Sequence, residues 1–318
     1  MSVYHDVRAR RTPHDTAGPD GALDVVPLPR RGRLVAAALV LVVAGLFLYG
    51  AATNSNYQWS TYASYLFDAR IVAASWNTIQ LTIWAMVLGL ALGILLAIMR
   101  LSGNPVLRYI SWAYLWVFRG TPVYVQLVFW GLFSSIYPQI GIGIPFLHRF
   151  ATFDIQGLNA AFVFGAIGLG LNEAAYMAEI VRAGLLSVGE GQNEAAAALG
   201  MSSAQTMRRI VLPQAMRVII PPTGNELISM LKTTSLVTAV PYTLDLYSRA
   251  RAISGVTFRP VPLLLVASTW YLAITSLLML GQYFLERRYA RGATRKLTVK
   301  QQRLAVSASH MPPDGLPR

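Results

Sequence analysis

The segment NEAAAALGMSSAQTMRRIVLPQ (residues 193–214) is polar, rich in alanine and interrupted by a glycine, although long apolar segments lie before and after it. Glu194, the four alanines that follow it and Leu199 favour a helix. Gly200 comes next, and glycine suits the left-handed residue that commonly ends a helix. The first part of the segment therefore predicts a short helix that ends in a glycine bend.

A second short helix is predicted directly after the bend. Ser202 and Gln205 have the S-x-x-Q spacing of a capping box, in which each side chain satisfies a backbone donor of the new helix. We expect this helix to stop near Leu212, because Pro213 disfavours helical geometry for the residue before it. A helix, a bend and a helix would form a rigid unit suited to contact with a partner, whereas an ordinary interfacial connector is the alternative.

Composition places the whole chain in a membrane. Of its 318 residues 54% are hydrophobic and only 13% are charged, which is too little charge to coat a soluble surface. The net charge of +13 does not indicate nucleic acid, because the basic residues cluster at the tails and beside apolar runs without interleaved aromatics. There is no cysteine, so disulfides, thiolate nucleophiles and zinc–cysteine sites are excluded.

Six apolar segments are long enough to cross a hydrocarbon core of about 30 Å, so the fold class predicted is an all-α, multi-pass integral membrane protein. The segments are residues 34–52, 77–99, 121–139, 159–182, 214–236 and 262–285. Most arginines beside these segments fall on one side, which predicts that both termini and the 183–213 loop are cytoplasmic. Residues 1–33 and 291–318 are expected to be basic cytoplasmic tails, the first of them disordered, and the 240–261 loop fits this topology least well.

Polar residues inside the predicted spans are candidates for a translocation path, because a charge near the bilayer centre is costly and usually faces a cavity or a partner. The candidates are Asn172, Glu173, Asn225, Ser229 and Lys232. The last three are spaced by four and three residues, so they share one helical face. Lys232 is expected to pair with Glu173 or Glu226, and the alternative is a polar cluster that only joins helices.

Seven residues of the opening segment closely resemble the EAA loop of the permeases of ATP-binding cassette (ABC) importers. They are Glu194, Ala195, Ala196, Gly200, Ile210, Leu212 and Pro213. FRGTPVYVQL (residues 118–127), AAYMAEIVRAG (174–184) and GNELISMLKTTSLV (224–237) are similar to segments of the polar amino acid branch of that family. The chain departs from the pattern at Thr233, where aspartate is common, and at Ala183, where glycine is common.

The same resemblance marks six further residues as family motif residues: Arg119, Gly120, Thr121, Pro122, Glu179 and Arg182. Without the resemblance, the residue types and their spacing favour simpler structural roles for three of them. Glu179 and Arg182 are three apart near a cytoplasmic helix end, which predicts a local ion pair, and Arg119 is expected to extend to the membrane interface. Gly89 and Gly93 form a G-x-x-x-G motif that fits internal packing and a dimer seam equally well.

The resemblance implies the type I importer permease fold, with a five-helix core at residues 76–290 that includes a coupling loop at 190–213. An extra N-terminal membrane helix and an extracytoplasmic loop, residues 34–75, would precede this core. The implied function is the permease subunit of an importer that carries an amino acid across the cytoplasmic membrane. The implied partners are ABC ATPase subunits, a second permease subunit, an extracytoplasmic amino-acid-binding protein and membrane lipid.

ATP is expected to bind to another chain. No G-x-x-x-x-G-K-[ST] phosphate loop exists in the sequence, and none of the three lysines follows a glycine. Hence no cofactor is expected in this chain, and ATP and Mg²⁺ belong to the ATPase partner. An enzyme is disfavoured because the four histidines are scattered over tails and a loop, without metal spacing. The remaining alternative is an ion-coupled secondary transporter, which would leave the EAA-like loop unexplained.

Overall fold

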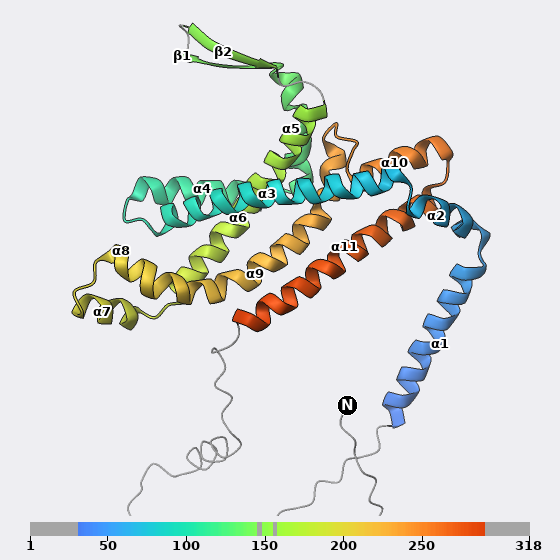
Figure 1. Ribbon diagram of the computed structural model, residues 1–318, viewed down its shortest axis with the longest axis horizontal. Coiled ribbons are helices and arrows are strands. Elements are labelled where there is room, and N and C mark those ends of the chain that lie inside the picture. Colours follow the sequence, from blue (N-terminus) through green and yellow to red (C-terminus); the bar gives the residue numbers. More distant parts are fainter. Residues whose placement is uncertain (1–30, 145–147, 155–157, 290–318) are drawn as a thin grey trace, which may run out of the picture. The chain divides into compact units, whose positions relative to one another are not determined.

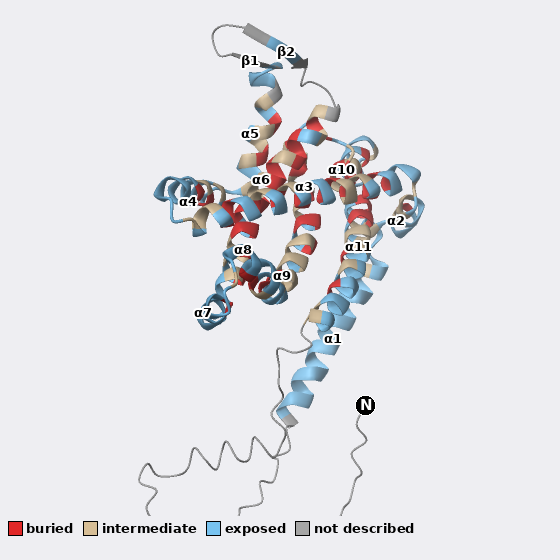
Figure 2. Ribbon diagram, turned by 60° about the vertical axis from the view of Figure 1, so that its left-hand side comes forward, coloured by how far each residue is buried: buried red, intermediate tan, exposed pale blue. Residues whose placement is uncertain are grey.

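The computed structural model describes residues 31–144, 148–154 and 158–289 (Figure 1). The chain forms two compact units, one ending at Tyr57 and the other beginning at Gln58. In the first unit, α1 (Arg31–Thr53) is followed by the 3₁₀ turn η1 (Ser55–Tyr57). The stretch Gly32–Thr53 of α1 is long and apolar enough to cross a membrane, and none of its side chains is buried (Figure 2). The predicted tails, apart from residues 31–33, lie outside the described residues.

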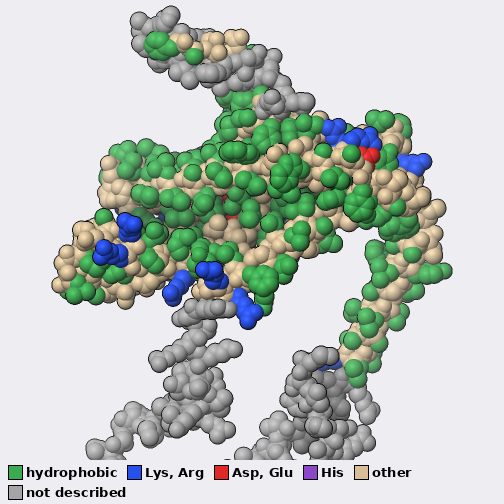
Figure 3. All heavy atoms as spheres, viewed as in Figure 1, with side chains coloured by type: hydrophobic (Ala, Val, Ile, Leu, Met, Phe, Trp, Pro, Cys, Tyr) green, Lys and Arg blue, Asp and Glu red, His purple; other side chains and the backbone are tan. Residues whose placement is uncertain are grey.

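The second unit is built mainly from helices, with one small hairpin. Its elements in order are α2 (Trp59–Leu66), α3 (Ala69–Leu101), α4 (Pro105–Gly120), α5 (Val123–Ile136), β1 (Gln139–Ile144), β2 (His148–Asp154), α6 (Leu158–Leu186), α7 (Glu190–Ala198), α8 (Ser203–Thr206), the π-helical turn η2 (Met207–Val211), α9 (Leu212–Thr233), the 3₁₀ turn η3 (Thr234–Ala239), α10 (Leu246–Thr257) and α11 (Pro260–Tyr289). On the face in Figure 3, apolar side chains cover most of this unit and basic side chains gather toward its ends.

Four helices in the described part of the chain are long and apolar enough to span a membrane by themselves: Gly32–Thr53, Ala69–Leu101, Ala160–Leu186 and Pro260–Tyr289. The other two predicted spans are built differently. The 121–139 segment gives the 14-residue helix α5, and α4 precedes it across a short break. The 214–236 segment falls mostly in the 22-residue helix α9, which carries too many polar residues to count as an apolar span.

Close packing of α3 against α6 forms the centre of the second unit, and glycines make it possible. A Cβ atom placed on Gly93 would lie 2.6 Å from the Cβ of Met177 and 3.1 Å from the carbonyl oxygen of Ala174. A Cβ on Gly89 would lie 2.7 Å from the Cγ of Glu173. The G-x-x-x-G motif therefore serves internal packing, because both of its glycines face α6 of the same chain.

Two segments expected to be extracytoplasmic loops, residues 140–158 and 240–261, contain regular structure. β1 and β2 pair antiparallel, with Gln139 opposite Asp154, in the 140–158 region. The 240–261 region contains α10, whose N-terminus is held on α3: the backbone N–H of Leu246 donates to Thr78 Oγ1 at 2.9 Å, and Asn77 Nδ2 donates to the carbonyl of Leu244 at 3.0 Å. These tertiary contacts explain why apolar periodicity alone did not reveal α10.

We expect Gly93→Val to destabilise the second unit by about 1–3 kcal/mol, the usual cost of overpacking a close helix contact. Gly103→Val is the matched control, because a Cβ on Gly103 meets no atom within 4 Å. Thermal unfolding of the two purified variants in the same detergent, followed by size-exclusion chromatography, measures the difference. Equal midpoints for Gly93→Val and the wild type would contradict the packing described here.

Candidate functional site

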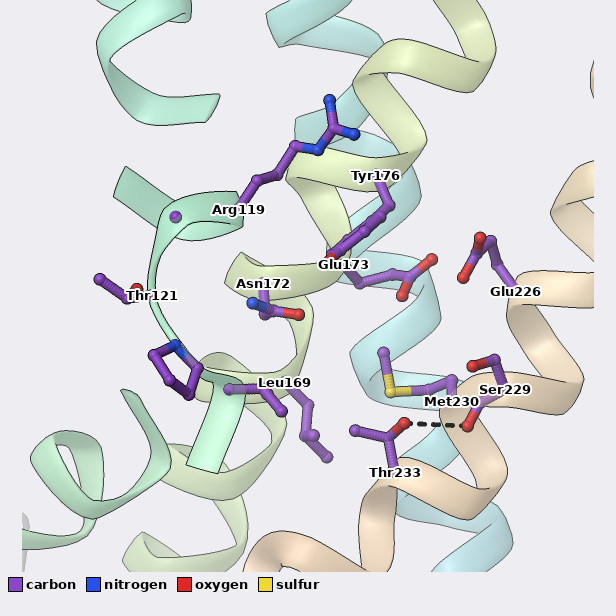
Figure 4. Close-up of a pocket in the computed structure, with 13 residues that line it drawn as sticks. Arg119, Thr121, Leu169, Asn172, Glu173, Tyr176, Glu226, Ser229, Met230 and Thr233 are labelled. Atoms are coloured by element: carbon purple, nitrogen blue, oxygen red, sulfur yellow. Dashed lines mark hydrogen bonds between the residues drawn. The ribbon is translucent and has the colours of Figure 1, made fainter. Parts of the chain in front are cut away.

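A cavity of about 630 Å³ lies among α4, α5, α6 and α9 (Figure 4). Residues 119–123 line it from the α4–α5 break; Leu169, Asn172, Glu173 and Tyr176 line it from α6; and Glu226, Ser229, Met230 and Thr233 line it from α9. Its volume is within the range of about 300–1,000 Å³ that is typical of small-molecule sites. Three predicted path residues, Asn172, Glu173 and Ser229, and the Arg-Gly-Thr-Pro motif therefore meet in one place.

The break between α4 and α5 is caused by Pro122 and stabilised by two side-chain amides. Proline has no N–H, so the carbonyl of Phe118, four residues earlier, loses its normal helical donor. Asn172 Nδ2 and Gln126 Nε2 each donate to that carbonyl at 3.0 Å. Gln126 Nε2 also donates to Thr121 Oγ1 at 2.7 Å, and Asn172 Nδ2 donates to Gln126 Oε1 at 3.1 Å. The motif thus lies at the start of α5, as the sequence predicts, but the helix α4 that ends just before it was not predicted.

Gln126 is a site residue that the sequence analysis did not single out. The signal was present, because a proline within an apolar segment frees the carbonyl four residues before it. An amide side chain four residues after Pro122, one turn into the next helix, is placed to supply the missing donor.

One wall of the cavity is electropositive. Arg119 lines the cavity with its guanidinium carbon 5.6 Å from the centre of the Tyr176 ring, although it was expected to extend to the membrane interface. The N-terminus of the 14-residue helix α5 is adjacent, at Pro122 and Val123. Helix N-termini carry a partial positive charge, so this wall favours a negatively charged group.

The opposite wall is acidic. Glu173 is 5% exposed, and its Oε1 atom has no hydrogen-bond partner among the described residues. Glu226 is half-buried on α9, and Figure 4 shows the two carboxyl groups extending toward each other. An unpaired buried carboxylate is costly unless a cation or a proton meets it. This wall therefore favours a positively charged group.

The predicted pairing of Lys232 with Glu173 or Glu226 is wrong. The ion pairs in the described part of the chain are Asp68–Arg70, Arg100–Glu179 and Arg182–Glu179, and Lys232 is exposed and outside the cavity lining. The reason is helical geometry, because six residues separate Glu226 from Lys232 and place them on different faces of α9. Asn225 is also exposed and lies outside the cavity. Asn225, Ser229 and Lys232 form an exposed polar stripe along α9.

The predicted local ion pair is present. Arg182 Nη2 lies 2.7 Å from Glu179 Oε2, and Arg182 Nε donates to the same oxygen at 2.9 Å. Within the described residues, no group of three or more His, Cys, Asp or Glu side chains is arranged to hold a metal ion.

The loop between α6 and α9 has the predicted glycine bend. Gly200 has φ of 71°, its N–H donates to the carbonyl of Ala197 at 2.9 Å, and the N–H of Met201 donates to the carbonyl of Ala196 at 3.0 Å. This is a complete Schellman cap. Ser202 and Gln205 form the predicted capping box. Both ends of the bend are therefore fixed by hydrogen bonds.

The second helix does not stop near Leu212 as predicted. The chain continues through α8 and η2 into α9, and the N–H of Leu212 donates to the carbonyl of Met207, five residues earlier. This wider π-helical turn accommodates Pro213 without ending the helix. The second half of the loop, from Ser203 onward, and the α9 wall of the cavity are consequently one continuous helical element.

Buried apolar residues attach this loop to the neighbouring helices, while other polar and apolar residues of the loop are exposed. Val188 and Val211 pack with Ala97 and Val181 in one buried cluster. Ala196 is fully buried, whereas Leu199 is 81% exposed beside the bend. The remaining motif residues divide in the same way: Ile210 is half-buried, and Glu194, Ala195, Leu212 and Pro213 are exposed. α7 begins at Glu190, so Glu194 lies in the middle of that helix, not near its start.

Comparison with known proteins assigns the chain to a family. Residues 89–291 match the model of the "Binding-protein-dependent transport system inner membrane component" family. The chain belongs to this family. It is therefore an integral membrane permease subunit of an ABC importer, a class in which separate subunits hydrolyse ATP and a binding protein delivers the solute. It is a transport subunit and not an enzyme, and the alternative of an ion-coupled secondary transporter is not favoured.

Individual relatives agree with this assignment. The permease is 57% identical over 280 residues to the arginine transport system permease protein ArgU of Corynebacterium glutamicum, covering 88% of this chain and 87% of that protein. It is 36% identical to the histidine/lysine/arginine/ornithine transport system permease protein HisM of Salmonella typhimurium, covering 69% of this chain and 89% of HisM. The predicted resemblance to the polar amino acid branch is confirmed.

A solved structure supports the fold. The crystal structure of an amino acid ABC transporter with histidines contains a chain that is 32% identical, with a TM-score of 0.58, covering 70% of the permease and 95% of that chain. The type I importer permease fold predicted from the EAA-like loop is thus confirmed.

We expect Gln126→Met and Asn172→Leu each to destabilise the permease by about 1–3 kcal/mol, because each removes a donor from the partly buried carbonyl of Phe118. The double variant should lose less stability than the sum of the two single losses. Both side-chain amides donate to the Phe118 carbonyl, and Asn172 also donates to Gln126. Denaturation midpoints of the four proteins form the double-mutant cycle. Val125→Leu, an exposed position on the same helix, is the control, and strictly additive effects would contradict the shared cap.

Proposed function

We propose that this permease imports a basic amino acid through the cavity between α4, α5, α6 and α9. The observation that carries the proposal is the buried, unpaired carboxyl of Glu173 facing that of Glu226 across the cavity. A cationic side chain or α-amino group would satisfy these carboxyls. The names of the relatives, which refer to arginine and to histidine, lysine, arginine and ornithine, support the same class of solute.

The opposite wall suits the α-carboxylate that every amino acid carries. Arg119 and the α5 N-terminus lie there, and half-helix N-termini that point at substrate carboxylates are a recurring arrangement in transporters. Two walls of opposite sign would orient a basic amino acid, with its carboxylate toward the α4–α5 break and its positive end toward α6 and α9. A neutral amino acid would leave one of the two carboxyls unpaired.

A second permease subunit, either a copy or a paralogue, is the expected neighbour of α9. The polar stripe of Asn225, Ser229 and Lys232 is exposed on a helix that is predicted to cross the bilayer, where lipid tails offer polar groups no partner. A water-filled path between two permease subunits would solvate these side chains. In that arrangement the stripe lines the path, and the cavity opens beside it.

The 190–213 loop is proposed to couple the permease to the ATPase. Its hydrogen-bonded bend presents Leu199 outward at 81% exposure, with Glu194 exposed on the same short helix. An exposed leucine next to an acidic group suits a groove with an apolar floor and a basic rim. With this loop and both termini on the cytoplasmic side, β1, β2 and the region around α10 face the extracytoplasmic binding protein.

For the acidic wall, we expect Glu226→Gln and Glu173→Gln to lower the kcat/KM of arginine uptake by at least about tenfold. Each change removes a hydrogen bond to a charged group, which contributes about 1.5–3 kcal/mol. Uptake of radiolabelled arginine by reconstituted complexes measures the effect. Glu286→Gln is the control, because that side chain lies outside the cavity lining and can still accept a hydrogen bond from Gln282.

Two results would contradict the proposal that the substrate is a basic amino acid. One is unchanged arginine uptake in both cavity variants. The other is loss of the ATPase subunits from both, because the carboxyls would then have a purely structural role.

For the loop, we expect Gly200→Val to leave membrane insertion intact but to remove most copurifying ATPase and uptake. Valine disfavours the positive φ that the bend requires. Gly191→Val is the matched control, since Gly191 lies inside α7 with a negative φ and open space around it. Glu194→Arg should weaken ATPase attachment without altering the fold. Wild-type transport by both Gly200→Val and Glu194→Arg would show that the loop is only a connector.

A further inference from the structure

A second cavity, of about 430 Å³, lies where α3 ends, α4 begins and α6 completes its last turns. It is lined by Arg100, Leu101, Arg108, Tyr109, Trp112 and Arg182. None of these residues lines the translocation cavity. We refer to it below as the arginine cavity.

The arginine cavity has an excess of positive charge. The carboxylate of Glu179 lies beside this cavity and forms ion pairs with two arginines, Arg182 at 2.7 Å and Arg100 at 3.9 Å. Arg108 is exposed and takes part in none of the ion pairs of the part of the chain that the structure describes. Three guanidinium groups therefore converge on a space that a single carboxylate borders.

The cavity also has an aromatic floor that continues along α4. Arg108, Trp112 and Trp116 are spaced by four residues, so they follow one another on the same helical face. The Trp112 and Trp116 rings stack with centroids 6.2 Å apart and an angle of 9° between their planes. Both rings are more than half exposed, and Tyr109 is 70% exposed beside them. Exposed tryptophan and tyrosine side chains are typical of the membrane–water interface.

We propose that the arginine cavity binds the headgroup of an anionic phospholipid. The phosphate would accept hydrogen bonds from Arg100, Arg108 and Arg182, because guanidinium groups match phosphate geometry. An acyl chain would lie against Trp112 and Trp116. Basic cavities between membrane helices are typical sites for anionic headgroups, and the aromatic floor distinguishes a lipid from a free anion, which has no apolar part to bury.

The position of the site gives the lipid a structural effect. Its headgroup would bridge the ends of α3, α4 and α6, and α4 leads directly to Arg119 and the α4–α5 break. The phosphate would also share Arg182 with Glu179, so lipid binding and the local ion pair are linked. This inference depends on the membrane location of the chain and is independent of which solute is carried.

The test uses the delipidated permease complex, purified with its ATPase subunits and titrated with phosphatidylglycerol, with lipid adducts counted by native mass spectrometry. We expect Arg108→Gln to weaken phosphatidylglycerol binding about fivefold, the factor that corresponds to about 1 kcal/mol for one arginine near an anionic lipid. Arg217→Gln, at an exposed arginine of α9 outside the cavity, is the matched control and should bind like the wild type. Phosphatidylcholine binding should not change in either variant.

A second variant tests for the opposite effect, an increase in lipid affinity. Glu179→Gln removes the competing carboxylate and should increase phosphatidylglycerol affinity, an effect that general loss of structure cannot produce. Three outcomes would overturn the proposal: equal phosphatidylglycerol binding by Arg108→Gln and Arg217→Gln, complete displacement of the lipid by millimolar inorganic phosphate, or loss of ATPase subunits from Arg108→Gln with lipid binding unchanged. The last outcome would assign the cavity to a protein partner.

Discussion

The carbonyl of Phe118 needs a hydrogen-bond donor, and the arrangement around the cavity between α4, α5, α6 and α9 follows from the way it obtains one. Pro122 cannot supply the donor, and lipid offers no substitute. Asn172 from α6 and Gln126 from α5 donate instead, each at 3.0 Å. These bonds let the chain turn from α4 into α5 and hold that turn against α6. The result is a stable helix end and a stable helix start beside a cavity, which an uninterrupted span would not provide.

The acidic side of the cavity depends on a different constraint, the close contact of α3 and α6. Gly89 leaves room for the Glu173 side chain, whose Cγ would be only 2.7 Å from a Cβ at that position. The carboxyl is thus buried by packing, yet its Oε1 atom has no partner among the described residues. A fold selected only for stability would place an apolar residue there, since burying an unpaired carboxyl is unfavourable. The solute path proposed above would account for this charge.

The sequence predicted the membrane class, the glycine bend and the capping box, because these depend on composition and on contacts within a few residues. It located Asn172, Glu173 and Ser229 as polar residues in apolar surroundings, and they line the cavity. It began a span at residue 121, just before α5, but it did not predict the helix α4 that ends there or the tertiary hydrogen bonds of Asn172 that stabilise the break. It also paired Lys232 wrongly, because opposite charges suggest a pair, whereas helix geometry places Lys232 away from Glu226. The helix α10 was missed for a similar reason, since its start is held by Asn77 and Thr78 of distant α3.

The failure of Pro213 to end its helix has a mechanical consequence. Because the π-helical turn carries the chain from α8 into α9 without interruption, the second half of the 190–213 loop and the cavity wall belong to one element. The loop end of that element is braced by the Schellman cap and the capping box, and its far end carries Glu226 and Ser229. A force applied beside Gly200 is therefore not absorbed by a flexible joint before it reaches α9. In contrast, the α4–α5 wall is fixed to α6 by the hydrogen bonds that the side-chain amide of Asn172 donates. Movement of the loop by an attached ATPase would shift the Glu226 side of the cavity relative to the Arg119 side, and so change how well the two walls of opposite sign hold a charged solute between them.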